Sequence, residues 1–67
     1  MSIAKISEIS STSTESFEDA IRQGIVRATK TLRNVKSAWI KEQQVLVKDG
    51  RLSEYQVNMM VTFVLED

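Results

Sequence analysis

The chain has 67 residues, of which 42% are hydrophobic, and its nine basic and nine acidic residues cancel to a formal net charge of zero. This length fits one domain, which we expect to span residues 1–67, and the balanced charge excludes the strongly basic profile of a nucleic-acid-binding protein. The absence of cysteine and histidine excludes disulfides, thiolate sites and the most common general base. A chain this short buries only about 60% of its unfolded surface, so we expect self-association to stabilise it.

Neither a membrane segment nor a secretory signal is expected. No apolar run reaches the roughly 20 residues that a membrane helix needs, and the N-terminal stretch MSIAKISEIS lacks the apolar region of a signal peptide. The sequence therefore predicts a soluble, cytoplasmic protein with no membrane or nucleic-acid partner.

The first expected element is a short strand. Ile3, Ile6 and Ile9 are mixed with polar residues over a strand-like length, and the Ser/Thr-rich stretch SSTSTES that follows is typical of a loop and a helix start. Thr12 and Glu15 have the spacing of a capping box, while Ser13 or Thr14 fits equally well as the N-cap.

An amphipathic helix is expected next. Its apolar positions follow the i, i+3, i+4, i+7 pattern of a helix with one buried face. They are Phe17, Ala20, Ile21, Gly24, Ile25, Ala28 and Leu32. On the opposite face, Glu18 and Arg22 are spaced for an ion pair. Gly24 in the apolar stripe predicts close approach of the helix to a sheet.

Two long strands, Val35 to Lys48 and Arg51 to Leu65, flank the dipeptide Asp49-Gly50, which favours a two-residue type I′ hairpin. If the turn is tight, paired residues have numbers that add up to 99, and Gln43 is the partner of Gln56. Alternate residues of the second strand, from Tyr55 to Leu65, form an apolar face that should meet the helix together with Ala38 and Ile40. A β-bulge between Lys41 and Gln44 would restore the broken alternation of the first long strand.

This register places Ser37 and Trp39 on the face of the sheet that the helix does not cover. Met60 and Val64 lie on the same face, and so does Gln56. A bare face with apolar residues needs a cover, either other copies of the chain or a ligand. The expected fold class is therefore α+β, a three-stranded antiparallel sheet packed on one amphipathic helix.

The sequence resembles the dodecin family. The segments that carry the resemblance are TSTESFEDAI, RATKTLRNV and EYQVNMMVTFVLED, which with the hairpin cover nearly the whole chain. The resemblance implies a β-α-β-β fold and assembly into a hollow homododecamer. It also implies binding of stacked flavin pairs, such as riboflavin or FMN, between tryptophans, with a role in flavin storage or buffering rather than catalysis.

Three residues follow from the resemblance as candidate flavin-binding residues. Gln56 falls on the family's glutamine that hydrogen-bonds the polar edge of the isoalloxazine ring. The family's stacking tryptophan falls on Ser37, and Trp39 is two residues later, about 7 Å along the same face of the strand. A branch of dodecin-like proteins that lacks the stacking tryptophan is linked to calcium, and SAWIKEQQ (residues 37–44) is similar to that branch.

Two hypotheses follow. In the first, Trp39 stacks on a flavin and Gln56 orients it, in a pocket shared between subunits. In the second, a structural assembly binds no flavin and is empty or holds cations such as calcium, and Trp39 fills the pocket as an interface anchor. No residue cluster of the sequence points to a metal site by itself. No nucleophile–base pair is visible either, so enzymatic activity is not expected.

Overall fold

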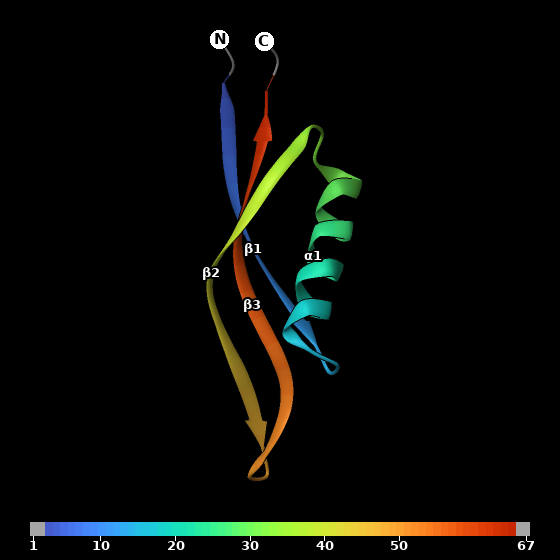
Figure 1. The fold of residues 1–67 in the computed structure, drawn as a ribbon, viewed down its shortest axis with the longest axis vertical. Helices are drawn as coiled ribbons and strands as arrows, with labels where there is room; N and C mark the ends of the chain where they lie inside the picture. The colour runs from blue at the N-terminus through green and yellow to red at the C-terminus, as the bar shows by residue number, and fades with distance from the viewer. Residues whose placement is uncertain (1–2, 66–67) are drawn as a thin grey trace.

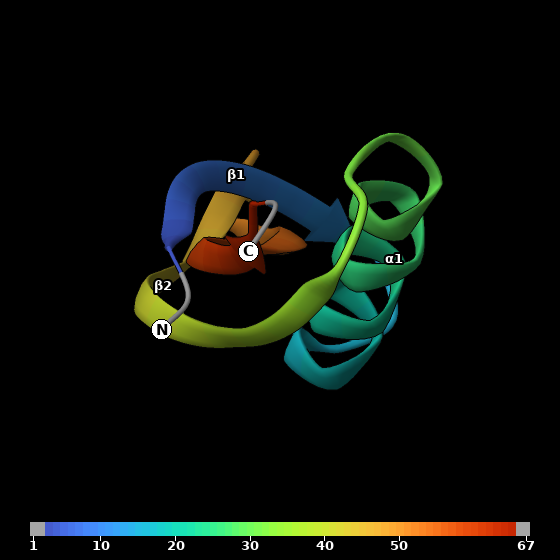
Figure 2. The same cartoon turned by 90° about the horizontal axis from the view of Figure 1, so that it is seen from above.

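The computed structural model describes residues 3–65, so residues 1–2 and 66–67 of the expected domain lie outside the described residues. Strand β1 spans Ala4–Ser13, helix α1 spans Phe17–Thr31, and the strands β2 and β3 span Val35–Lys48 and Arg51–Val64. The three strands form one antiparallel sheet in the order β1-β3-β2. The helix lies along one side of this twisted sheet (Figure 1, Figure 2). The predicted α+β class and β-α-β-β order are confirmed.

The first strand is longer than the sequence suggested, and the expected helix caps are wrong. Strand β1 continues through the Ser/Thr stretch to Ser13, which pairs with Tyr55 on β3. The N-cap of α1 is Ser16, whose Oγ accepts a hydrogen bond of 2.9 Å from the backbone N–H of Asp19. Pairing with β3 supplies backbone partners that outweigh the turn preference of serine and threonine, which shifts the cap three residues beyond Ser13.

The core lies between the helix and the central strand. Its fully buried residues are Ala20 on α1 and Val57, Met59 and Val61 on β3. Gly24 and Ala28 continue the buried stripe of α1. The predicted helix stripe and the apolar face of the second long strand are therefore confirmed except at one position each, since Ile25 is 36% exposed and Leu65 is 43% exposed. Ala38 also packs against this core, whereas Ile40, which was expected there, remains 38% exposed.

The hairpin turn has the expected geometry. Asp49 and Gly50 have φ values of 53° and 75°, the two positive values that a type I′ turn requires. Lys48 pairs with Arg51, and a register shift between Ile40 and Glu42 leaves Lys41 as the predicted bulge residue.

One register prediction is wrong by a residue. A further shift, between Leu46 and Val47, makes Ser53 an extra residue on β3, so Gln56 pairs with Gln44 and Gln43 pairs with Val57. The second shift at Lys41 returns the ladder to the predicted register, and Trp39 pairs with Met60 as expected.

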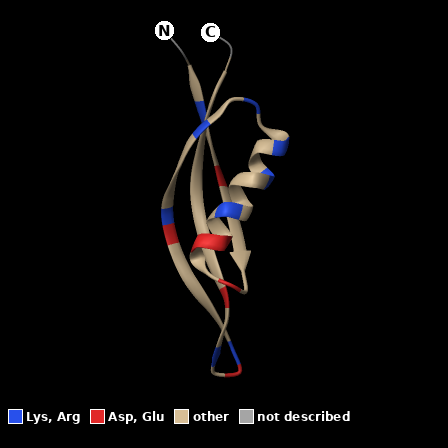
Figure 3. Cartoon of the chain, turned by 45° about the vertical axis from the view of Figure 1, so that its right-hand side comes forward, with Lys and Arg blue, Asp and Glu red and all other residues tan. Residues whose placement is uncertain are grey.

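Charge is unevenly distributed along the helix. Glu18 and Asp19 lie in its first turn, and basic residues follow along the rest of it (Figure 3). The predicted Glu18–Arg22 pair forms, with 3.7 Å between Glu18 Oε2 and Arg22 Nη2. Among residues 3–65, no helix is long and apolar enough to cross a membrane.

Candidate flavin site on the open face of the sheet

On the face of the sheet opposite the helix, side chains form four rows across the strands. Each row contains one side chain from each of the three strands. The rows are Ile6–Thr62–Ser37, Glu8–Met60–Trp39, Ser10–Asn58–Glu42 and Thr12–Gln56–Gln44. Side chains that lie opposite each other on paired strands point to the same side, so these rows form one surface, called here the open face. All three predicted site residues, Ser37, Trp39 and Gln56, lie on it.

Trp39 has free aromatic surface on the open face. It is 49% exposed and lies opposite Met60 on β3. A half-exposed indole beside a further apolar side chain, that of Met60, is the kind of surface that a ligand or a partner can cover. Ser37, in the neighbouring row, is a small exposed residue and leaves the space beside the indole open.

Gln56 is held in place by neighbours from both flanking strands. Its Nε2 donates to Ser10 Oγ at 2.9 Å and to Asn58 Oδ1 at 3.3 Å, and its Oε1 accepts from Gln44 Nε2 at 3.3 Å. Asn58 in turn donates to Glu42 Oε1 at 2.9 Å. A ligand that hydrogen-bonds to the Gln56 amide would replace one of these contacts with its own donor or acceptor. The remaining contacts would still fix the plane of the amide.

Trp39 and Gln56 do not form one compact site within a single protomer. The partner of Trp39 is Met60, which is four residues from Gln56, so the two side chains are about 13 Å apart along the sheet. The row between them holds Glu42, Asn58 and Ser10.

An ion pair crosses the open face beside the tryptophan. Lys41 Nζ lies 3.4 Å from Glu8 Oε1, so the side chain of the bulge residue extends from β2 to β1. Both side chains are about half exposed, at 52% and 45%, and such a pair contributes little to stability. Its effect is to place one positive and one negative group at the edge of the surface that Trp39 offers.

Within residues 3–65, no group of three or more acidic, cysteine or histidine residues is arranged to hold a metal ion. Glu8 and Glu42 are carboxylates of the open face, each bonded to another side chain of the same protomer.

Sequence reasoning missed several residues of this surface. The roles of Ser10, Gln44 and Glu8 were not foreseen. The first strand was expected to end near Ile9, and the predicted ladder partner of Gln56 was Gln43, one residue away from its true partner. Asn58 could have been placed on this face by the alternation of β3, because it lies two residues from Gln56.

Comparisons with known proteins agree on one family. The family model described as Dodecin matches residues 3–66. A Thermus thermophilus protein named Dodecin is 38% identical over 60 residues, which cover 90% of this chain and 87% of that protein.

Two solved structures extend the comparison. A dodecin from Streptomyces davaonensis has a TM-score of 0.92 and 35% identity, covering 98% of this chain and 97% of that chain. A calcium-chelating antigen from Mycobacterium tuberculosis, described as a calcium dodecin with a novel calcium-binding site, has a TM-score of 0.85 and 25% identity, covering 96% of this chain and 91% of that chain.

Proposed function

The chain belongs to the dodecin family, and on this premise we propose that it is a non-enzymatic flavin-binding protein that stores or buffers riboflavin or FMN. Each chain is one domain of a hollow homododecamer in the cytoplasm, and the flavins lie between open faces of neighbouring protomers. The observation that carries this proposal is the half-exposed indole of Trp39 on the same bare face as the fixed amide of Gln56.

The chemistry of the open face suits an isoalloxazine ring. Trp39 supplies a flat aromatic surface, and stacking of a nucleic-acid base on an aromatic side chain contributes about 1–3 kcal/mol. The thioether of Met60 adds a polarizable apolar neighbour. The Gln56 amide offers one donor and one acceptor in a plane, the pattern that the imide edge of a flavin complements.

A site shared between two protomers would bring together a Trp39 and a Gln56 that are far apart within one chain. Because Trp39 and Gln56 lie about 13 Å apart along the sheet, a flavin on the indole of one protomer receives its imide hydrogen bonds from the Gln56 of another. Ser37 leaves room beside the ring, where the family's own stacking residue would lie. Binding and assembly are therefore coupled in this proposal.

Substitution of Gln56 tests the ligand role apart from assembly. Gln56→Ala removes two hydrogen bonds of about 0.5–1.5 kcal/mol each, so flavin affinity should fall about five- to 150-fold while the size-exclusion profile stays that of the oligomer. Thr12→Ala is the matched control, because Thr12 lies on the same row and makes no hydrogen bond to the Gln56 side chain. Equal flavin affinity in all three proteins would refute the role of Gln56.

A second candidate function is a dodecin-like structural assembly that binds no flavin and holds cations such as calcium. The observations that favour it are the likeness to the calcium dodecin and the two carboxylates, Glu8 and Glu42, on the open face. In this alternative Trp39 fills the ligand space between subunits. Trp39→Ala would then disrupt the oligomer, and an oligomer that survives this substitution would eliminate the alternative.

A further inference from the structure

A series of side-chain hydrogen bonds runs across the open face through Gln56. Gln44 Nε2 donates to Gln56 Oε1 at 3.3 Å, and Gln56 Nε2 donates to Asn58 Oδ1 at 3.3 Å. Asn58 Nδ2 then donates to Glu42 Oε1 at 2.9 Å. Each residue donates to the next, and the series ends at a carboxylate. We refer to Gln44, Gln56, Asn58 and Glu42 as the amide relay.

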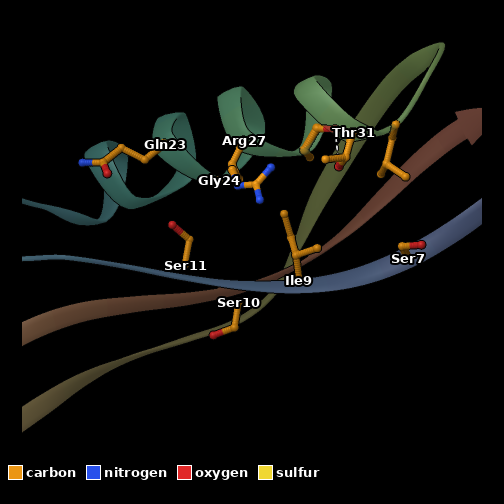
Figure 4. A pocket seen from close by; sticks show the side chains of 10 residues that line it. Ser7, Ile9, Ser10, Ser11, Gln23, Gly24, Arg27 and Thr31 are labelled. Atoms are coloured by element: carbon orange, nitrogen blue, oxygen red, sulfur yellow. Dashed lines mark hydrogen bonds between the residues drawn. The ribbon is translucent and has the colours of Figure 1, made fainter.

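Ser10 supports the amide relay from strand β1. Its side chain points away from the helix, whereas those of Ile9 and Ser11 point toward it (Figure 4). In the ladder Ser10 lies opposite Asn58, so its Oγ reaches Gln56 diagonally, two residues along β3, and accepts from Gln56 Nε2 at 2.9 Å. The nitrogen side of the Gln56 amide is therefore held by two acceptors from two strands.

Glu42 is the one member of the amide relay whose hydrogen-bonding polarity cannot reverse. An ionised carboxylate only accepts hydrogen bonds, whereas a side-chain amide donates at its nitrogen and accepts at its oxygen. Each amide of the relay keeps nearly the same shape when it is turned by 180° about its terminal bond. The hydroxyl of Ser10 can donate as well as accept, so it fits either orientation of Gln56. The direction of the relay is therefore set at Glu42.

The orientation set at Glu42 passes to Gln56 through Asn58. Because Glu42 accepts, Asn58 turns its nitrogen toward the carboxylate and leaves its oxygen for Gln56. Gln56 then turns its nitrogen toward Asn58 and its oxygen toward Gln44. A hydrogen bond to a charged group is about twice as strong as one between neutral groups. The Glu42 end of the relay therefore dominates the choice of direction.

This orientation makes Gln56 an acceptor toward a ligand. Both N–H groups of its amide are used, by Asn58 and by Ser10. Its Oε1 accepts one hydrogen bond, from Gln44, and has a second lone pair. A ligand carbonyl can add a further bond at Nε2 by taking the place of Ser10, and the contact with Asn58 then still holds the amide. A reversed amide would offer a ligand a free N–H in place of the free lone pair.

We propose that Glu42, acting through Asn58, is a positioning residue that fixes the Gln56 amide with its oxygen free for a ligand, so that the site selects an aromatic ligand with an imide-type N–H donor. This inference rests on the proposed function and deepens it by naming the residue that sets the selectivity of the flavin site. Glu8, the neighbouring carboxylate of the open face, is bonded to Lys41 and takes no part in the relay.

Selectivity between riboflavin and 3-methylriboflavin tests this role, because the methyl group of the analogue replaces the imide hydrogen. The natural protein, freed of metal ions, should bind riboflavin at least about fivefold more tightly, the loss expected when a hydrogen-bonding partner is removed. Glu42→Gln keeps the shape of an exposed side chain but can also donate. An amide that populates both orientations equally presents its oxygen half of the time, so the affinity ratio should fall at least about twofold.

Two further variants show whether the effect travels through Asn58. Asn58→Val interrupts the amide relay with a residue that suits a strand, and it should lower the affinity ratio as Glu42→Gln does. In the double variant the second substitution should add nothing, because residues that act in one hydrogen-bond network are not additive. Additive losses would refute the action through Asn58.

Glu8→Gln is the matched control, since it makes the same change of charge on the same face at a carboxylate outside the relay. It should leave the ratio of the two affinities unchanged. An equal fall of the ratio in Glu8→Gln and Glu42→Gln would show that the charge of the face, and not the orientation of Gln56, determines the selectivity.

Neutron diffraction from deuterated crystals of the flavin-free protein tests the orientation without a ligand, because neutrons distinguish nitrogen from oxygen and locate deuterium. The natural protein should show the Asn58 nitrogen toward Glu42 and the Gln56 nitrogen toward Asn58, and Glu42→Gln should show both orientations of Gln56. A reversed Gln56 in the natural protein, or a single unchanged orientation in Glu42→Gln, would overturn the inference.

The failure of this inference is distinguishable from the failure of the proposed function. Riboflavin binding with an affinity ratio that Glu42→Gln leaves unchanged refutes the role of Glu42 and leaves the proposed function standing. An absence of flavin binding by the natural protein contradicts the proposed function and overturns the selectivity with it, whatever orientation the amides have.

Discussion

Gly24 of α1 lies directly against Met59 of β3. A Cβ atom added at Gly24 would come within 2.5 Å of Met59 Cε and 3.2 Å of Ser11 Cβ. The glycine that weakens the helix stripe in the sequence is thus the residue that lets the helix approach the sheet over its fully buried methionine.

Replacing Gly24 by alanine should destabilise the protein despite alanine's better helix propensity. The gain in propensity is about 1 kcal/mol. Met59 Cε is the flexible end of a side chain, but it is fully buried, and Ser11 Cβ is attached directly to the backbone of β1. We therefore expect the overpacking cost of a filled core, typically about 1–3 kcal/mol. We expect a net loss of about 1 kcal/mol in the free energy of unfolding, measured by urea denaturation at one fixed protomer concentration. Thr29→Ala, on the exposed face of the helix, is the control that reports the gain in helix propensity alone, and a Gly24→Ala protein more stable than the natural protein would contradict the close packing.

Substitution of the N-cap separates the observed start of the helix from the one that the sequence suggested. Ser16→Ala removes the side chain that accepts the Asp19 N–H and should lower the free energy of unfolding by about 1 kcal/mol. Thr12→Ala, at the residue of the apparent capping box, should have a much smaller effect because Thr12 is exposed and lies within β1. Thermal unfolding of the two variants side by side would reveal the opposite ranking if the helix began earlier.

The hairpin turn should be sensitive to backbone conformation alone. Gly50 has a φ of 75°, and an added Cβ would meet nothing within 4 Å. Gly50→Ala should therefore destabilise by about 1–2 kcal/mol, the cost of a left-handed conformation for an alanine, without any steric clash. Asp49→Gly is the control, because glycine accepts the positive φ at that position; equal stability of Gly50→Ala and the natural protein would argue against the type I′ geometry.

Removal of the ion pair on the open face should leave stability almost unchanged. Lys41 and Glu8 are about half exposed at a separation of 3.4 Å, and pairs of this kind contribute about 0–1 kcal/mol. Lys41→Ala and Glu8→Gln should each change the free energy of unfolding by less than about 0.5 kcal/mol. A larger loss of unfolding free energy, equal in both variants and absent at high salt, would show that the ion pair stabilises the sheet substantially.

The sequence was a good guide where the signal is local. The helix that begins at Phe17 and the Asp49-Gly50 turn depend on residues close in the chain, and both were predicted correctly. The end of β1 was not, because its Ser/Thr residues form a strand only through pairing with distant β3. Ser53 carries no mark of a bulge in the sequence, yet it determines that Gln44, and not Gln43, bonds Gln56.

In the candidate site, too, features set by local sequence were predictable and contacts between distant residues were not. Alternation along β2 and β3 was enough to place Trp39, Ser37 and Gln56 on one face. It could not show that Ser10 of β1 holds the Gln56 amide, or that Lys41 reaches across to Glu8. These contacts join residues more than 30 positions apart, and only the register of the folded sheet brings them together.

The central claim is that Trp39 stacks on a flavin. Because the protein contains one tryptophan, its tryptophan emission reports on Trp39 directly. Riboflavin and FMN would be titrated into metal-free protein while the emission of Trp39 and of the flavin are followed together. The account predicts that both emissions are quenched with the same midpoint, and that Trp39→Ala weakens binding at least about fivefold, the loss of one stacking contact. Unquenched tryptophan and flavin emission up to high micromolar flavin would contradict the account and favour the cation-holding assembly.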